Sequence, residues 1–200
     1  MRRGILHIGS AFLLAACAQQ GEPDEATTET TAETTAETIA VEADPSTSQP
    51  AGSTARADIR DAQGNSLGVV DLEDTDFGVT LSGALTGLSL GEHGFHVHEV
   101  GLCEPPAFES AGGHFAPAGR RHGFHDPDGP HAGDLRNLMV SEDGSATVDM
   151  ADSLVTLRRG ASALLDGDGS ALVVHADPDD YRSQPSGNSG DRVACGLIEG

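Results

Sequence analysis

The chain has 200 residues, which suits one domain of ordinary size with an appendage. Asp and Glu number 32 against 11 basic residues, all of them Arg, and the formal charge of -21 argues against attraction to nucleic acid or to an anionic membrane surface. With 26 Gly, no Trp and an aromatic fraction of 4%, the composition favours a small, turn-rich fold of short strands over a helical bundle.

Residues 1–16 are predicted to be a signal peptide. A pair of arginines precedes an apolar run over residues 5–16, which is too short to span a bilayer comfortably. The run ends in the string LAAC, which resembles the lipobox of bacterial lipoproteins. The resemblance implies that Cys17 is lipidated and becomes the mature N-terminus. An ordinary signal peptide with an incidental cysteine is the alternative. In both cases we expect export, and with the anchor a location in the cell envelope, in the periplasm or at the outer membrane.

Residues 17–54 are predicted to form a disordered tether. The segment is dominated by Thr, Glu, Ala, Ser and Pro, includes the near-repeat TTETTAETTAET, and offers almost nothing apolar to bury. Its glutamates repel one another, so we expect an extended spacer between the anchor and a folded domain over residues 55–200.

The folded part is predicted to be all-β. Short runs of alternating or β-branched apolar residues are separated by the turn signals QGN, EDGS and DGDGS. The expected strands are 55–60, 67–72, 78–85, 94–99, 137–140, 146–149, 171–175 and 193–198. Two segments, 101–136 and 176–191, are longer than structureless connections usually are in a compact domain. Long loops in small domains tend to carry function, so we expect the functional site there.

Two histidines in the string GFHVHE form the first candidate site. Side chains alternate faces along a strand, so His96 and His98 project to one side and Val97 to the other. Such a pair is a natural metal chelate, although solvent-facing histidines on a strand give the same pattern.

The first long segment supplies further ligand types between Gly- and Pro-rich gaps. Three imidazoles and a carboxylate, from His114, His122, His131 and Asp134, match the nitrogen and oxygen ligands of a closed structural zinc site. A polar surface loop is the alternative. His175 ends the apolar run ALVVH, where a strand end can deliver a ligand, although a lone histidine there is also compatible with a core residue.

Six strings of the sequence resemble those of the copper/zinc superoxide dismutase family, in family order over residues 55–200. They are GFHVHE, GGHF, RRHG, HAGDL, LVVHADPDD and GNSGDRVACG. The resemblance implies an eight-stranded Greek-key β-barrel, a sandwich architecture, with two long functional loops. It also implies dismutation of superoxide to dioxygen and hydrogen peroxide, with one copper ion and one zinc ion per subunit.

Carried over position by position, the resemblance assigns a role to each candidate residue. Copper is expected on His96, His98, His114 and His175, and zinc on His114, His122, His131 and Asp134, so that His114 is the bridging imidazolate. Asp179 is expected to hydrogen-bond one ligand from each metal site, and Arg192 to attract and orient the anion beside copper. His7, His93 and His125 match no ligand position.

The cysteines beyond Cys17 form an even pair in an oxidising compartment. The resemblance implies a disulfide between Cys103 and Cys195, with two free thiols as the alternative. A non-enzymatic copper- or zinc-binding or metal-delivery protein on the same scaffold is the rival function, and the full set of seven ligands with Arg192 argues against it. The sequence leaves monomer and homodimer open, and it predicts membrane contact only through the lipid anchor.

Overall fold

The computed structural model describes residues 52–200, so the predicted signal peptide, most of the tether and Cys17 lie outside the described residues. The strands of the described part are β1 (Thr54–Asp61), β2 (Ser66–Thr75), β3 (Gly78–Leu85), β4 (Gly91–His93), β5 (Phe95–His98), β6 (Leu138–Val140), β7 (Ala146–Asp152), β8 (Ala171–His175) and β9 (Arg192–Glu199). Two short 3-10 helices, η2 (Glu109–Ala111) and η3 (Gly160–Ser162), lie in the connections. Over residues 52–200 no helix has the length and apolar character needed to span a bilayer.

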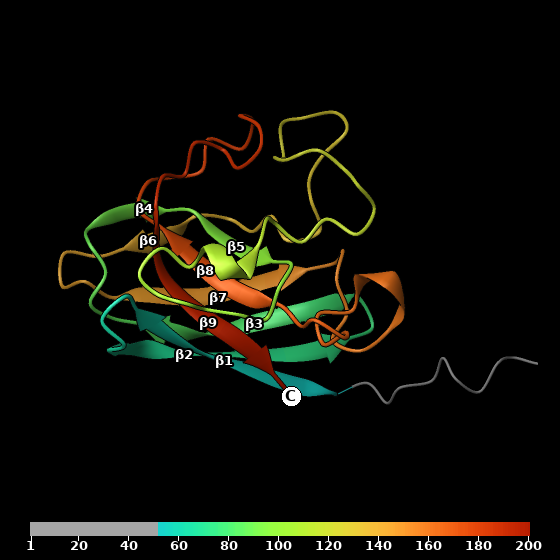
Figure 1. Ribbon diagram of the computed structural model, residues 1–200, viewed down its shortest axis with the longest axis horizontal. Coiled ribbons are helices and arrows are strands. Elements are labelled where there is room, and N and C mark those ends of the chain that lie inside the picture. The colour runs from blue at the N-terminus through green and yellow to red at the C-terminus, as the bar shows by residue number, and fades with distance from the viewer. Residues whose placement is uncertain (1–51) are drawn as a thin grey trace, which may run out of the picture. The chain divides into compact units, whose positions relative to one another are not determined.

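Seven strands form one antiparallel sheet in the order β5-β8-β9-β1-β2-β3-β7, and β4 pairs with β6 in a second, two-stranded sheet (Figure 1). Since β9 lies beside β1 and β7 beside β3, the chain makes the long return connections of a Greek key. Only Gly94 separates β4 from β5. The strand predicted over 94–99 is therefore part of a longer strand that changes partner at Gly94, from β6 to β8. Counted as one interrupted strand, β4 and β5 give the eight strands expected, and the all-β prediction is confirmed.

The barrel core follows from the two-residue alternation of the strands. In β1, Ala57 and Ile59 are completely buried whereas Arg56 and Asp58 are exposed. The same alternation in the other strands supplies most of the core, which includes Val70, Leu72, Val79, Leu81, Leu85, Val148, Leu172, Val174 and Ile198. Each such buried side chain contributes roughly 1.5–3 kcal/mol. A register slip of one residue would turn these side chains outward, so the core fixes the strand pairing that carries the site.

The outer face of β8 and β9 is also covered. Leu172 and Val174 point into the barrel, so Val173 between them points outward and joins a second, smaller cluster. That cluster consists of Phe108, Ala111, Ala171, Val173 and Cys195. The loop that follows β5 is thus packed against the outside of the barrel rather than hanging in solvent.

A disulfide between Cys103 and Cys195 also fastens this loop to the barrel, with 5.7 Å between the two Cα atoms. It joins the loop after β5 to the middle of β9 across a sequence separation of 92 residues. The predicted pairing is confirmed, and the alternative of two free thiols is excluded for this structure.

Candidate metal centre

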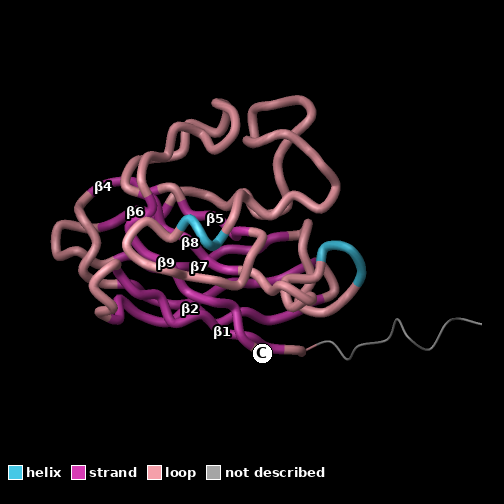
Figure 2. The backbone as a smooth tube through the Cα atoms, viewed as in Figure 1, coloured by secondary structure: helices cyan, strands magenta, loops and turns pink. Residues whose placement is uncertain are grey.

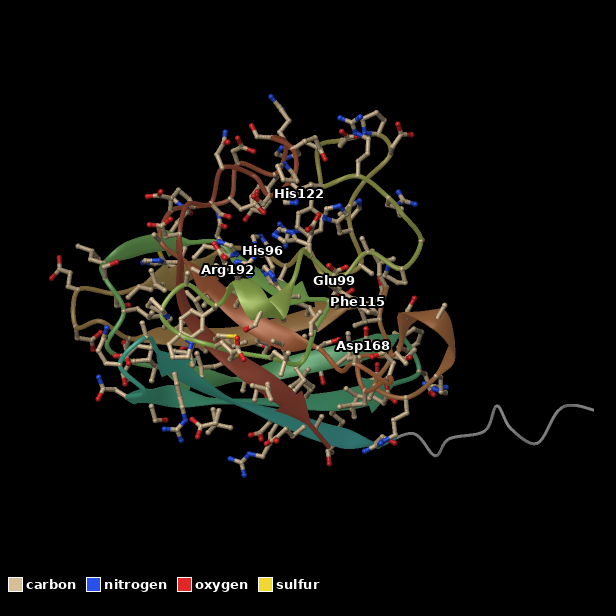
Figure 3. The ribbon with its side chains drawn as sticks, in the orientation of Figure 1. His96, Glu99, Phe115, His122, Asp168 and Arg192 are labelled. Atoms are coloured by element: carbon tan, nitrogen blue, oxygen red, sulfur yellow. A yellow bond between two sulfur atoms is a disulfide. The ribbon has the colours of Figure 1, made fainter. Side chains whose placement is uncertain are left out.

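The long loop between β5 and β6 is held along the free edge of β5. The Val97 N–H donates to the Gly133 carbonyl at 2.9 Å, and the Glu99 N–H donates to the Gly113 carbonyl at 3.0 Å. The Glu99 carboxylate returns the contact by accepting the Gly113 N–H at 2.9 Å (Figure 3). These backbone ladders place His114 opposite His98, and Asp134 opposite His96. Residues far apart in the sequence are therefore brought to β5 by sheet-like pairing.

Both long loops rise from the same end of the barrel, the first in green to yellow and the second in red in Figure 1. Figure 2 shows the second as irregular chain, and the first as irregular chain apart from the short helix η2. His96 and His98 of β5 are buried beneath them, and Val97 points into the barrel core, as the alternation predicts. Figure 3 shows His122 of the first loop above His96, in the space between the loops.

Four histidines meet in the first ligand set, which we call the four-histidine set. It consists of His96, His98, His114 and His175, whose ligand nitrogens lie within 4.8 Å of one another. One nitrogen of each ring, Nδ1 of His96 and Nε2 of the other three, is buried without a hydrogen-bond partner in the described structure. Four unpartnered buried nitrogens at one point are costly unless a cation satisfies them. Imidazole nitrogens suit copper, so the set fits this ion.

The second nitrogen of each of these rings has a hydrogen-bond partner, which fixes the orientation of the ring. Nδ1 of His98 donates to the Gly112 carbonyl at 3.0 Å, and Nδ1 of His175 lies 3.2 Å from the Gly190 carbonyl. Nε2 of His96 lies 2.8 Å from a carboxylate oxygen of Asp179. The unpartnered nitrogens are therefore the ones left to point at a common centre.

The second ligand set is built around one carboxylate oxygen and is called the three-histidine-aspartate set. Oδ1 of Asp134 lies 2.8 Å from Nδ1 of His114, 3.0 Å from Nδ1 of His122 and 3.2 Å from Nδ1 of His131. The other oxygen of Asp134 accepts the Gly123 N–H at 2.8 Å and the His131 N–H at 3.0 Å. Three nitrogens and one oxygen held this closely are the donors of a closed four-coordinate zinc site.

His114 belongs to both sets. Its Nδ1 faces Asp134 in the three-histidine-aspartate set, while its Nε2 is one of the unpartnered nitrogens of the four-histidine set. One ring can therefore hold two cations at its opposite nitrogens.

Asp179, in the loop after β8, connects the two sets from outside. Its Oδ2 lies 2.8 Å from Nε2 of His96 and its Oδ1 lies 3.0 Å from Nε2 of His122. Asn137 clamps its backbone, since the Asn137 side chain accepts the Asp179 N–H and donates to the Asp179 carbonyl, both at 3.0 Å. Sequence reasoning placed Asp179 in this role but missed Asn137, which it treated only as the start of a strand.

Electrostatics favour cation binding at the four-histidine set, whereas His122 of the second set must give up a proton to bind a metal. Burial lowers the pKa of His96 to about 3 and that of His175 to about 4, and it also depresses the pKa values of His98 and His114. These rings are therefore neutral near pH 7 and have a lone pair to offer. At His122 burial opposes the charge, but the hydrogen bonds with Asp134 and Asp179 outweigh it and raise the pKa to about 9 in the metal-free protein.

Gly187 provides a direct test of the Asp179 bridge. Its φ is +66°, and a Cβ at this position would lie 1.8 Å from Oδ1 of Asp179 and 2.7 Å from Nε2 of His122. We expect Gly187→Ala to displace Asp179 and weaken metal retention by about ten- to a hundredfold, as loss of an outer contact to metal ligands typically does. Competition with a chelator measures it. Gly160→Ala is the matched control, since Gly160 has φ +68° and open space around its Cβ position. Equal metal retention in the two variants would contradict the role of Asp179 in holding the metal ligands.

Arg192 begins β9 and lies beside the four-histidine set. Its Nη1 donates to the Phe108 carbonyl at 2.6 Å and its Nη2 to the Gly112 carbonyl at 2.7 Å, the same carbonyl that holds His98. Burial lowers the pKa of Arg192, and Glu109 opposes that shift. The side chain lines a depression of about 410 Å³ together with Glu109 and Asp191.

The histidines without a predicted role stay outside both sets. His93 is buried, and its Nδ1 donates to the His175 carbonyl at 2.6 Å. His125 is exposed in the first loop, and His7 lies outside the described residues. The other ring nitrogen of His93, Nε2, lies 3.1 Å from the Ser89 hydroxyl and 2.9 Å from the Ser89 carbonyl.

An all-β barrel that carries two cation sites joined by one histidine ring defines a class of binuclear metalloprotein. The chain belongs to the copper/zinc superoxide dismutase family, whose model matches residues 66–198. It is 43% identical over 146 residues to superoxide dismutase [Cu-Zn] 2 of Aquifex aeolicus, covering 72% of this chain and 85% of that protein. It is 44% identical over 149 residues to superoxide dismutase [Cu-Zn] of Caulobacter vibrioides, covering 73% and 86%.

A solved structure gives the same result. The crystal structure of a double mutant of a SOD-like protein from Bacillus subtilis matches with a TM-score of 0.70 and 41% identity, over 72% of this chain and 97% of that chain. The barrel and its loops are thus those of the family, and copper and zinc are the ions that the family requires.

Proposed function

We propose that the protein converts two superoxide ions and two protons into dioxygen and hydrogen peroxide, with copper on the four-histidine set and zinc on the three-histidine-aspartate set. The observation that carries the proposal is that His114 presents one nitrogen to each set. The names of the relatives from Aquifex aeolicus and Caulobacter vibrioides support it.

Copper supplies the one-electron redox couple for this reaction, which zinc lacks. The protein's own residues supply positioning and proton transfer. Because Nδ1 of His114 faces Asp134, Nε2 is the nitrogen of this ring that would bind copper, and whenever it does not hold the ion it could carry a proton for the product. Asp179 holds His96 and His122 in place from outside while this occurs.

Arg192 attracts and orients superoxide. The chain repels anions at long range because of its net charge of -21, so a local positive group beside the site is required. Arg192 is held by two carbonyls and pairs with neither of the carboxylates in its depression in the described structure. Its charge therefore remains available to the substrate.

Replacement of Arg192 by alanine is expected to lower kcat/KM about tenfold, the value of one charge-assisted contact with an anion in a partly exposed site. The loss should shrink as salt is raised, because screening removes the same attraction from the wild type. Pulse measurements of superoxide decay over a range of ionic strength test this. Arg182→Ala removes an exposed charge from the second loop and should have a much smaller effect. Equal losses in the two variants would refute a specific role for Arg192.

A metal-buffering or metal-delivery protein is the alternative function. It predicts stoichiometric binding of copper and zinc with at most one superoxide consumed per copper. The completeness of both ligand sets and the fixed guanidinium favour the enzyme, since a buffer has no need of an anion-orienting arginine.

We also propose that the protein is exported and held in the cell envelope by a lipid on Cys17, where it protects the envelope from superoxide. The signal pattern supports this, and so does the disulfide, because such bonds persist in oxidising compartments. Cys17→Ser is expected to abolish incorporation of a labelled fatty acid and to move the protein from the detergent phase to the aqueous phase on detergent partition. Unchanged partition with no label in the wild type would overturn the anchor.

A further inference from the structure

Phe108 combines two features that rarely occur together. Its backbone has φ 54° and ψ 26°, the left-handed region that side chains other than Gly, Asn and Asp seldom adopt. Its side chain is nevertheless only 2% exposed. A strained backbone conformation persists only where the surrounding structure enforces it, and such residues concentrate at functional sites.

The side chains around Phe108 hold its ring in place. It packs with Val173 of β8 and Cys195 of β9 in the small cluster on the outer face of the barrel. The backbone at the same residue is held by the Phe108 N–H donating to the Glu104 carbonyl at 3.0 Å. The loop between Cys103 and Gly112 is therefore attached to the barrel by the disulfide, by this ring together with Ala111 in the same cluster, and by the hydrogen bonds of Arg192 itself.

The carbonyl of Phe108 points to the functional site. It accepts Nη1 of Arg192 at 2.6 Å and the Ala111 N–H at 3.2 Å. The turn that begins at Phe108 ends at Gly112, whose carbonyl accepts the other terminal nitrogen of Arg192 at 2.7 Å. Both acceptors of the guanidinium thus lie on one short turn, and the left-handed residue sets the direction of the first.

We propose that Phe108 is a positioning residue for Arg192: its ring, buried against β8 and β9, holds the turn whose two carbonyls orient the guanidinium toward an incoming anion. This inference rests on the proposed function, because it assumes that Arg192 receives the anion. Phe108 itself belongs to neither ligand set.

The disulfide does not make this role redundant. Cys103 stands five residues before Phe108 in the sequence, and the intervening segment contains Pro105 and Pro106, which donate no backbone hydrogen bond. Truncation of the ring leaves the disulfide intact but removes the largest side chain that packs this turn against β8 and β9.

The test is a double-mutant cycle on the full mature chain loaded with copper and zinc, with inorganic azide as the anion probe. Azide affinity is read from the visible absorption of copper, and metal content is measured on each sample. We expect Arg192→Ala to weaken azide binding about tenfold and Phe108→Ala about fourfold. In the Arg192→Ala background, Phe108→Ala should change the affinity by less than about 1.5-fold, because residues that act through one another are not additive.

Two further variants separate positioning from general damage. Phe108→Leu keeps an apolar side chain in the cluster and should restore most of the affinity lost in Phe108→Ala. Leu157→Ala truncates a side chain that is equally buried in the main core and should leave azide affinity unchanged. A fourfold loss that persists in the Arg192→Ala background, or an equal loss in Leu157→Ala, would overturn the inference.

Superoxide turnover by the same samples keeps the two proposals apart. If the wild type binds metals and azide but does not turn over, the proposed function fails. If the wild type turns over and Arg192→Ala weakens azide while Phe108→Ala does not, only the role of Phe108 fails.

Discussion

Replacing His114 by alanine is expected to lower superoxide turnover by at least about a thousandfold, since the change removes a ligand from both sets and the proton carrier at once. No other residue of the site contributes to both sets, as its Nδ1 faces Asp134 and its Nε2 faces the other three histidines. Superoxide decay measured beside the copper and zinc content of the same sample tests this. Zinc retention should fall together with turnover.

The control for this variant is His125→Ala. His125 lies in the same loop but is exposed and belongs to neither set. It should keep both the metal content and the turnover of the wild type. If His114→Ala turned over superoxide at a rate close to that of His125→Ala, the bridging role of His114 would be wrong.

Removal of the disulfide is expected to have the largest effect on stability. Replacing Cys103 and Cys195 together by serine opens a loop closed across 92 residues, which lowers the free energy of unfolding by about 4–5 kcal/mol in the chain-entropy model. Urea unfolding of the metal-free protein, followed by circular dichroism, measures the loss.

Loss of the disulfide should also affect the functional site. The loop that the disulfide anchors carries the carbonyls that hold Arg192, so the double serine variant should also bind anions less tightly. Chemical reduction of the wild type should reproduce both losses. A variant with wild-type stability and anion affinity would show that the ring of Phe108 and the sheet contacts alone secure the loop.

Much of the site could be predicted because its residue types carry the information. Side chains alternate along a strand, so the spacing of His96 and His98 placed both on one face, and the structure has them there. Family order assigned the other ligands, and the structure brings each predicted set within ligand distance. Which ion occupies which set stays a prediction. The disulfide pairing came from the resemblance and not from spacing, because three cysteines alone leave their pairing open.

What sequence reasoning missed is mainly backbone chemistry. The carbonyls of Gly112 and Phe108 hold Arg192, and any residue type has a carbonyl, so no letter in the sequence marks them. The change of strand partner at Gly94 is a tertiary effect of the same kind, since the alternation of side chains continues on both sides of it. Asn137 clamps Asp179 across 42 residues, a contact that local patterns do not contain.

In the proposed function, the two ligand sets that share His114 together catalyse superoxide dismutation. Pulse measurement of superoxide decay by the mature chain with Cys17 replaced by serine, loaded with one copper and one zinc per chain, tests this claim. We predict many superoxide ions consumed per copper at an undiminished rate over successive pulses. Consumption of about one superoxide per copper, with both metals bound and no further decay, would contradict the claim and favour the metal-buffering alternative.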